Sequence, residues 1–267
     1  MEITQILGYF GALVIGIILG LIGGGGSILT VPVLVYLFYI NPVTATAYSL
    51  FVVGISALVG AINNIKKRLI DFRTAIVFSI PAFIAVYISR KYLVPAIPEE
   101  LITIGTFVLT KNVAIMVFFA IIMLIASISM IRDVKETSEG ALQRIAYNYP
   151  LIIVEGLVVG ILTGIVGAGG GFLIIPALVL FAKLPMKKAV ATSLLIIAIK
   201  SLIGFIGDIE TLNIDWYFLL TFTFISTIGI FIGVWLNRFI NGKKLKKSFG
   251  WFVLIMGIYI IIMEISR

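Results

Sequence analysis

Neither cysteine nor histidine occurs among the 267 residues of the chain. Without cysteine there is no disulfide, no thiolate metal site and no thiol nucleophile. Without histidine the chain lacks the commonest metal ligand and the side chain that most often carries protons near neutral pH. We therefore expect neither a metal nor a cofactor, and a function that relies on few titratable groups.

Charged residues are also scarce, at 12% of the chain against about a quarter in an ordinary soluble domain. Hydrophobic residues make up 61%, and the mean hydropathy is +1.21. A soluble fold of this size could not hide so much apolar side chain, because much of its surface stays exposed to water. The composition therefore predicts a polytopic integral membrane protein, with lipid as its surroundings.

The formal net charge of +8 does not indicate a nucleic-acid partner. The basic residues lie in short clusters between long apolar runs, which is the pattern of topology determinants. Residues 1–22 lack a basic start and continue into further apolar sequence, so no cleavable signal peptide is expected. We expect a multi-pass protein of the prokaryotic cytoplasmic (inner) membrane.

Apolar runs of about twenty residues, long enough to cross a bilayer as helices, divide the chain. Two longer apolar regions, 5–40 and 150–182, are interrupted by glycine tracts at 23–26 and 167–171. A helix does not continue through such a tract without a large entropic cost. Each region is predicted to be a helix, a non-helical break and a second, shorter helix. Full crossings are predicted at 45–64, 74–92, 112–131, 189–207, 216–237 and 248–265, with hydrophilic connections that include 65–73, 90–100 and 208–215.

The chain repeats itself at an offset of 144 residues. The segment from Gly16 to Pro32 returns at 160–176 with its glycines and its proline in register. A duplicated unit within a single transmembrane domain follows, with repeat 1 at about 1–140 and repeat 2 at about 145–267. Further residues match at the same offset: Ser49 with Ser193, Gly60 with Gly204 and Asp71 with Asp215.

The charges predict that the two repeats are inverted. Loop 65–73 is strongly basic, whereas its counterpart 208–215 carries only acids, so by the positive-inside rule they face opposite sides of the membrane. Alternate threading collects most of the 20 Lys and Arg on one side, predicted to be cytoplasmic, and puts both termini outside. Inverted repeats with broken helices are a common plan of secondary transporters.

The predicted fold is therefore all-α, with two inverted repeats, each a glycine-broken hairpin followed by three transmembrane helices. The charges do not decide whether each broken hairpin crosses the membrane fully or dips to the midplane and returns. Both paths place the loops on the same sides of the membrane. The uncharged glycine tracts suit a buried, re-entrant break better than an exposed turn.

The string Gly-Gly-Gly-Gly-Ser-Ile-Leu-Thr-Val-Pro at 23–32, and its echo Gly-Ala-Gly-Gly-Gly-Phe-Leu-Ile-Ile-Pro at 167–176, resemble the TauE/SafE sulfite-exporter family. The resemblance covers nearly the whole chain. It implies a membrane permease for small anions, with sulfite, sulfoacetate and other organosulfonates as substrates known or proposed in the family. It is specific for the family and not for one substrate. The related thiosulfate transporters rely on cysteines in the pathway, which this chain lacks.

The glycine tracts are the first candidate site. Where a glycine break precedes a helix, several backbone N–H groups point the same way with the positive end of the helix dipole behind them, which favours an anion. The alternative is that the glycines only allow close helix packing, as the outer pairs in Gly16-xxx-Gly20 and Gly160-xxx-Gly164 do. The predicted ligands are Gly24, Gly25, Gly26 and Ser27 in the first tract and Gly169, Gly170 and Gly171 in the second.

Lys200 is the second candidate, because a charge so deep in a predicted span is a functional-site hypothesis by default. Helical spacing puts it on one stripe with Ser193, and Ser49 and Ser56 form the matching stripe of the other repeat. We predict that these residues line the anion pathway. The alternative is that the Lys200 ammonium reaches the outer surface, although side chains lean toward the helix N-terminus, here the cytoplasmic end.

Three acidic residues have simpler interpretations. Glu155 either carries a coupling proton or pairs with a base in a loop. Asp71 and Asp215 precede apolar runs and are predicted to be helix N-caps.

The sequence thus predicts a permease, and not an enzyme, that exports a small sulfite-like or sulfonate-like anion. An intramembrane enzyme would need paired carboxylates, histidines or a nucleophile–base pair within the spans, and none is found. A membrane scaffold that transports nothing would not need two polar stripes or a buried lysine. The oligomeric state stays open, with a homodimer as one option.

Overall fold

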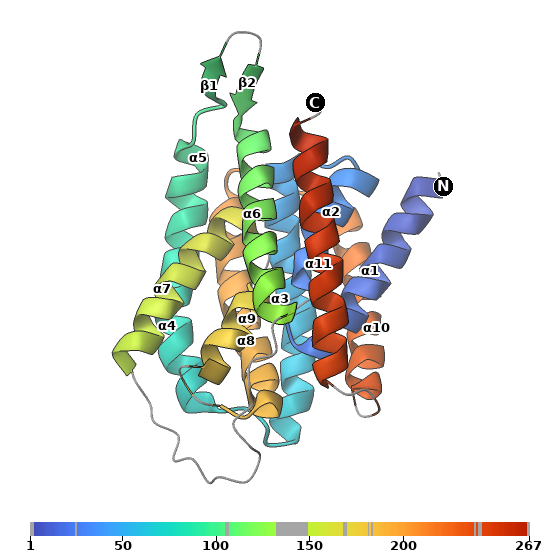
Figure 1. The fold of residues 1–267 in the computed structure, drawn as a ribbon, viewed down its shortest axis with the longest axis vertical. Helices are drawn as coiled ribbons and strands as arrows, with labels where there is room; N and C mark the ends of the chain where they lie inside the picture. The colour runs from blue at the N-terminus through green and yellow to red at the C-terminus, as the bar shows by residue number, and fades with distance from the viewer. Residues whose placement is uncertain are drawn as a thin grey trace.

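The computed structural model describes residues 3–24, 26–104, 107–131, 149–167, 170–180, 182, 184–237, 239 and 242–265. Most of these residues are helical, which confirms the all-α prediction (Figure 1). The elements are α1 (Ile3–Ile22), α2 (Ser27–Leu37), α3 (Pro42–Lys66), α4 (Phe72–Ile88), the π-helical turn η1 (Ser89–Leu93), α5 (Val94–Ala96), β1 (Glu100–Ile104), β2 (Phe107–Thr110), α6 (Lys111–Ile131), α7 (Tyr149–Val166), α8 (Gly171–Leu180), α9 (Met186–Ile209), α10 (Trp216–Leu236) and α11 (Gly242–Ile265).

Six helical segments in the described part of the chain are long and apolar enough to cross a membrane. Five of them agree with predicted crossings, and the sixth is Thr4–Ile22 in α1, the first arm of a broken hairpin. The predicted crossing 248–265 corresponds to α11, whose apolar part, Gly250–Glu264, is shorter because its first turns are rich in lysine. The six segments are Thr4–Ile22, Pro42–Lys66, Phe72–Ala96, Lys111–Ile128, Lys187–Ile209 and Trp216–Leu236.

Side-chain caps fix the starts of three long helices. Asn41 accepts a hydrogen bond from the Val43 N–H at 2.9 Å and is followed by Pro42 at the first helical position of α3. The carboxylates of Asp71 and Asp215 accept from the backbone N–H three residues later, at 2.8 and 3.0 Å, and start α4 and α10. The N-cap prediction for both aspartates is confirmed.

A short antiparallel hairpin of β1 and β2 joins α5 to α6 and projects beyond the helices (Figure 1). The sequence analysis did not predict it. Glu100 pairs with Thr110 at its base, and the register is irregular between Glu100 and Ile102.

The two broken hairpins form as predicted. α1 and α2 are separated by the first glycine tract, and α7 and α8 by the second. Gly23 and Gly167, 144 residues apart, both have positive φ, at 81° and 70°, a conformation that side-chain-bearing residues rarely adopt. The short arms α2 and α8 rise only about 15–17 Å, about half the hydrocarbon thickness of a bilayer.

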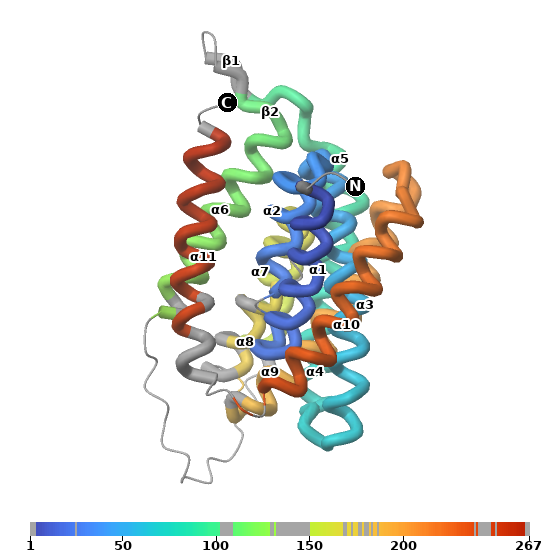
Figure 2. The backbone as a smooth tube through the Cα atoms, turned by 90° about the vertical axis from the view of Figure 1, so that its right-hand side faces the viewer, coloured from blue at the N-terminus to red at the C-terminus, as the bar shows by residue number. Residues whose placement is uncertain are grey.

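The helices of the two halves interlock. α3 and α9 pack against each other at the centre, α1 packs along α10, and α7 packs along α4. α1 and α7 begin at opposite ends of the molecule, and the N- and C-termini lie toward the same end (Figures 1 and 2). Gly16 and Gly20 lie against the α10 backbone, and Gly160 against that of α4, so the packing interpretation of these glycine pairs is confirmed.

Contacts between the halves also recur at the 144-residue offset. The Asp71 N–H donates to Thr192 Oγ1 at 3.0 Å, and the equivalent Asp215 N–H donates to the Tyr48 hydroxyl at 2.7 Å. In each pair the two halves exchange roles, as a two-fold relation between them requires. The opposite orientation of the halves across a membrane stays a prediction.

Candidate functional site

The two glycine breaks meet in the interior. A Cβ added to Gly24 would overlap the backbone of Gly171, and one added to Gly171 would overlap Gly24. Two inverted hairpins that crossed fully would carry their breaks at opposite membrane faces, where the breaks could not touch. The contact therefore favours the re-entrant path for the hairpins.

Lys200 lies over the second break. Its side chain is fully buried, and its Nζ donates to Thr163 Oγ1 in α7 at 2.7 Å. A Cβ on Gly170 would lie 2.7 Å from the same Nζ, so the amino group lies beside the residue that precedes α8. Gly170 has a positive φ of 68°.

The Lys200 ammonium is not neutralised by a carboxylate of the described residues. The ion pairs found there join other groups: Arg90 with Asp208, Lys91 with Glu210 and Lys111 with Glu99. An ammonium has three donors and no acceptor, so the one hydroxyl that it contacts among the described residues leaves donor capacity unused there. A buried, uncompensated cation is costly, which makes this position well suited to an anionic ligand.

The equivalent serines of the two repeats have different surroundings. Ser193 Oγ lies 3.1 Å from the Gly23 carbonyl and 2.8 Å from the Val190 carbonyl. Ser49 Oγ, also fully buried, has no partner in the described part of the chain. Ser49 is one turn along α3 from Thr46, against which Gly167 of the second break packs.

At the first break, a hydroxyl group bonds to the backbone and the chain packs tightly against α1. Ser27 donates to the Gly24 carbonyl at 2.7 Å and is the first residue of α2, with Gly26 at the N-cap position. A Cβ on Gly26 would lie 2.6 Å from the Leu19 nitrogen, so this glycine is needed for contact with α1. The Ser27 hydroxyl thus donates to the protein's own backbone, whereas the second break has the Lys200 side chain beside it.

The predicted ligands are thus only partly brought together. Gly24, Gly170, Gly171 and Lys200 gather where the breaks meet, and Ser193 contacts the first break. Ser49 is one turn along α3 from Thr46, which packs against Gly167. Ser56 points elsewhere, and its hydroxyl lies 3.1 Å from the Ser226 hydroxyl of α10. Gly25 and Gly169 lie outside the described residues.

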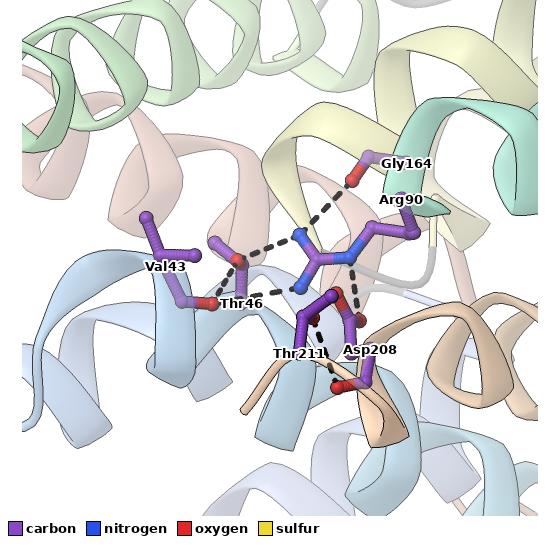
Figure 3. Close-up of polar contacts among 6 residues, drawn as sticks. All are labelled: Val43, Thr46, Arg90, Gly164, Asp208 and Thr211. Carbon is purple, nitrogen blue, oxygen red and sulfur yellow. Dashed lines mark hydrogen bonds and ion pairs between the residues drawn. The ribbon is translucent and has the colours of Figure 1, made fainter. Parts of the chain in front are cut away.

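A buried ionic cluster was missed by the sequence analysis (Figure 3). Arg90 is fully buried, and its Nε donates to Asp208 Oδ2 at 2.7 Å. Its Nη1 donates to Thr46 Oγ1 at 2.9 Å and to the Gly164 carbonyl at 3.2 Å, and Nη2 lies 3.5 Å from the Val43 carbonyl.

The sequence analysis placed the two charges in hydrophilic connections, at 90–100 and 208–215. The structure corrects these bounds, because η1 and α5 continue the path of α4 and α9 runs to Ile209. The sequence did hold one signal for this pair: Arg90 and Asp208 have opposite charges and lie at the ends of two spans that were predicted to end on the same side of the membrane.

A cavity of about 260 Å³ opens near the start of α3 and α10. None of the predicted anion ligands lines it. Its lining residues are Phe38, Ile40, Tyr48, Asp215 and Phe218.

Comparison with known proteins agrees with the glycine-tract pattern. The family described as sulfite exporter TauE/SafE matches residues 9–260, nearly the whole chain. The chain belongs to the TauE/SafE family. The resemblance carried by the two glycine tracts is therefore confirmed.

Relatives of this TauE/SafE protein are named as transporters. A "probable membrane transporter protein" of Xylella fastidiosa (strain 9a5c) is 29% identical over 258 residues, which cover 92% of this chain and 91% of the relative. The probable membrane transporter protein YunE of Bacillus subtilis (strain 168) is 27% identical over 276 residues, covering 94% and 92%. No solved structure matches the chain. The protein is a multi-pass membrane protein of a transporter family.

Glu155 is half-exposed on α7 of this TauE/SafE protein, and it forms no ion pair with the described residues. The loop 132–148, which holds the nearest bases in the sequence, lies outside the described part. Its predicted roles, in proton coupling or in pairing with a loop base, stay predictions.

Proposed function

We propose that the protein is a permease that exports a small monoanion, sulfite as hydrogensulfite or an organosulfonate, through a site at the second glycine break. The observation that carries the proposal is the Lys200 ammonium, which is fully buried, over Gly170, and paired with no carboxylate of the described residues. The family description names sulfite, and the relatives are named as transporters without a substrate.

Three groups complement an anion at this position. The Lys200 side chain supplies a positive charge in its protonated form, which an adjacent anion would favour. The first turn of α8 supplies backbone N–H groups with no partner inside the helix, together with the positive end of the helix dipole. The Ser49 hydroxyl, buried without a partner in the described part, is available to donate.

Transport follows from the relation between the two halves. We propose that they are inverted in the cytoplasmic membrane, with both termini outside, and that movement of one against the other exposes the site alternately. The charge pattern of the loops and the contacts that recur at 144 residues support this arrangement. An inside-negative potential favours export of a monoanion by about 2.3 kcal/mol per 100 mV, so no coupling ion is required.

Flux measurements test the proposal. Purified protein in liposomes should accelerate release of loaded ³⁵S-sulfite and of a labelled alkyl sulfonate, with an inside-negative potential set by potassium and valinomycin. Empty liposomes, and liposomes loaded with a labelled organic cation of similar size, are the controls. A scaffold or an intramembrane enzyme would leave anion release at the rate of empty liposomes.

A further inference from the structure

The Arg90–Asp208 cluster is not among the groups proposed to bind the anion. It joins four segments at the end of the molecule where both termini lie: η1 after α4, the last turn of α9, the first turns of α3 and the last turn of α7. α4 belongs to the first half of the chain and α9 to the second. A single buried guanidinium therefore ties the two halves together at this end (Figure 3).

The cluster is close to the second break. Thr46, which accepts from Arg90, also packs against Gly167 at the start of that break, and Gly164 lies one turn before it. Ser49 is one turn deeper along α3 than Thr46. Movement of the halves that opened a path from this end to Ser49 would have to separate these partners.

The opposite end of the molecule has no equivalent ion pair. The positions related to Arg90 and Asp208 by 144 residues are Val234 and Asn64, which cannot form one. Asn64 Nδ2 instead donates to the Gly60 carbonyl of its own helix at 2.9 Å. A neutral hydrogen bond from Asn237 to the Leu21 carbonyl ties α10 to α1 there. The ionic connection is therefore a one-sided feature of an otherwise repeated structure.

We propose that Arg90 and Asp208 form the gate at the end where the termini lie, closed in this structure and open when the ion pair separates; this rests on the proposed transport function. A buried ion pair suits this task, because its desolvation offsets much of its attraction while its hydrogen bonds fix one geometry. When the end opens, water solvates both charges and replaces the lost contacts. The pair thus specifies the closed state without making it irreversible.

Accessibility of a thiol placed below the gate tests this assignment. The chain has no cysteine, so Ser49→Cys provides a single buried reporter in the full-length protein. The rate at which a charged methanethiosulfonate reagent modifies it is measured by mass spectrometry in detergent solution. The reporter is combined with Asp208→Asn, which removes one charge, and with the double change Arg90→Met and Asp208→Leu, which leaves no unpaired charge and so protects folding.

Glu210→Gln is the matched control. The Lys91–Glu210 pair joins the same two segments at 3.4 Å but is exposed, so its loss should leave the reporter at the wild-type rate. Both gate variants should be modified at least about tenfold faster, within the range that coupled equilibria show. A wild-type rate in the folded double variant, or an equal increase with Glu210→Gln, would overturn the gate. The modification rate is measured without an anion. Failure of the proposed transport function would therefore be detected separately, in the flux assay.

Discussion

Lys200 differs from an ordinary transmembrane lysine in what surrounds its ammonium. Thr163, Gly170 and the start of α8 enclose the Nζ atom, so it lies within protein and does not reach a membrane surface. Replacing it with methionine keeps the length and removes the charge. We expect anion affinity to fall by about ten- to a hundredfold, the equivalent of a lost charge-assisted hydrogen bond of roughly 1.5–3 kcal/mol.

Isothermal titration with sulfite measures this change. Lys200→Arg should recover part of the affinity, because the charge returns with a different shape. Ser56→Ala is the control, since its hydroxyl contacts Ser226 and should not affect binding. Wild-type affinity in the methionine variant would remove Lys200 from the site.

Ser49 and Ser193 offer a second comparison, because they occupy equivalent positions with different contacts. Ser193→Ala removes hydrogen bonds to Gly23 and Val190 and should lower the free energy of unfolding by about 1 kcal/mol. Ser49→Ala removes a hydroxyl without a partner in the described part, so stability should hold or rise while anion affinity falls. Thermal unfolding with and without sulfite separates the two effects. The opposite pattern would place the anion at the first break.

The sequence was informative about some residues and silent about others. Lys200 could be predicted as a candidate because a charge in the middle of an apolar span is costly and is a functional-site hypothesis by default. Arg90 and Asp208 could not, because charges at span ends look the same whether they face water or each other. Only the tertiary arrangement of η1 and α9 shows that they are paired and buried.

At the scale of elements, the glycine breaks were predictable and their mutual contact was not. A tract of glycines ends a helix by local entropy alone, whereas the contact between Gly24 and Gly171 depends on how the two halves assemble. The β1–β2 hairpin was missed because no element was predicted between the connection 90–100 and the crossing 112–131. The sequence signal for strands was the enrichment of this segment in β-branched residues, threonine among them.

Gly170→Val tests the second break as an element. Valine resists a positive φ, and its Cβ would lie 2.7 Å from the Lys200 Nζ, so it should abolish anion binding and flux while the protein still inserts. Gly257→Ala is the control, since the nearest atoms to its Cβ would be Leu124 side-chain atoms at 3.1 and 3.3 Å and a carbonyl at 3.4 Å. Expression level and size-exclusion profile report insertion. Normal flux through the valine variant would show that the break serves packing alone.

At the scale of the whole molecule, the 144-residue repeat organises both the contacts and the predicted topology. Helix bounds and hairpin breaks followed from hydropathy and glycine, which act locally. The interlocking of α1 with α10 and of α7 with α4 did not, because no local pattern specifies which helix packs against which. The duplicated sequence shows that such contacts must come in pairs, and the structure supplies the partners.

Single-cysteine labelling in intact cells tests the inverted topology, and the cysteine-free chain needs no background substitutions. Lys67 and Glu210 are exposed residues in equivalent connections, after α3 and after α9. If the halves are inverted, Lys67→Cys should resist a membrane-impermeant maleimide until the cells are opened, whereas Glu210→Cys should react at once. Parallel halves would put both positions on one side, because each half would then cross the membrane in the same sense. Labelling of both from the same side would therefore contradict the inverted arrangement and, with it, alternating access by movement of the two halves.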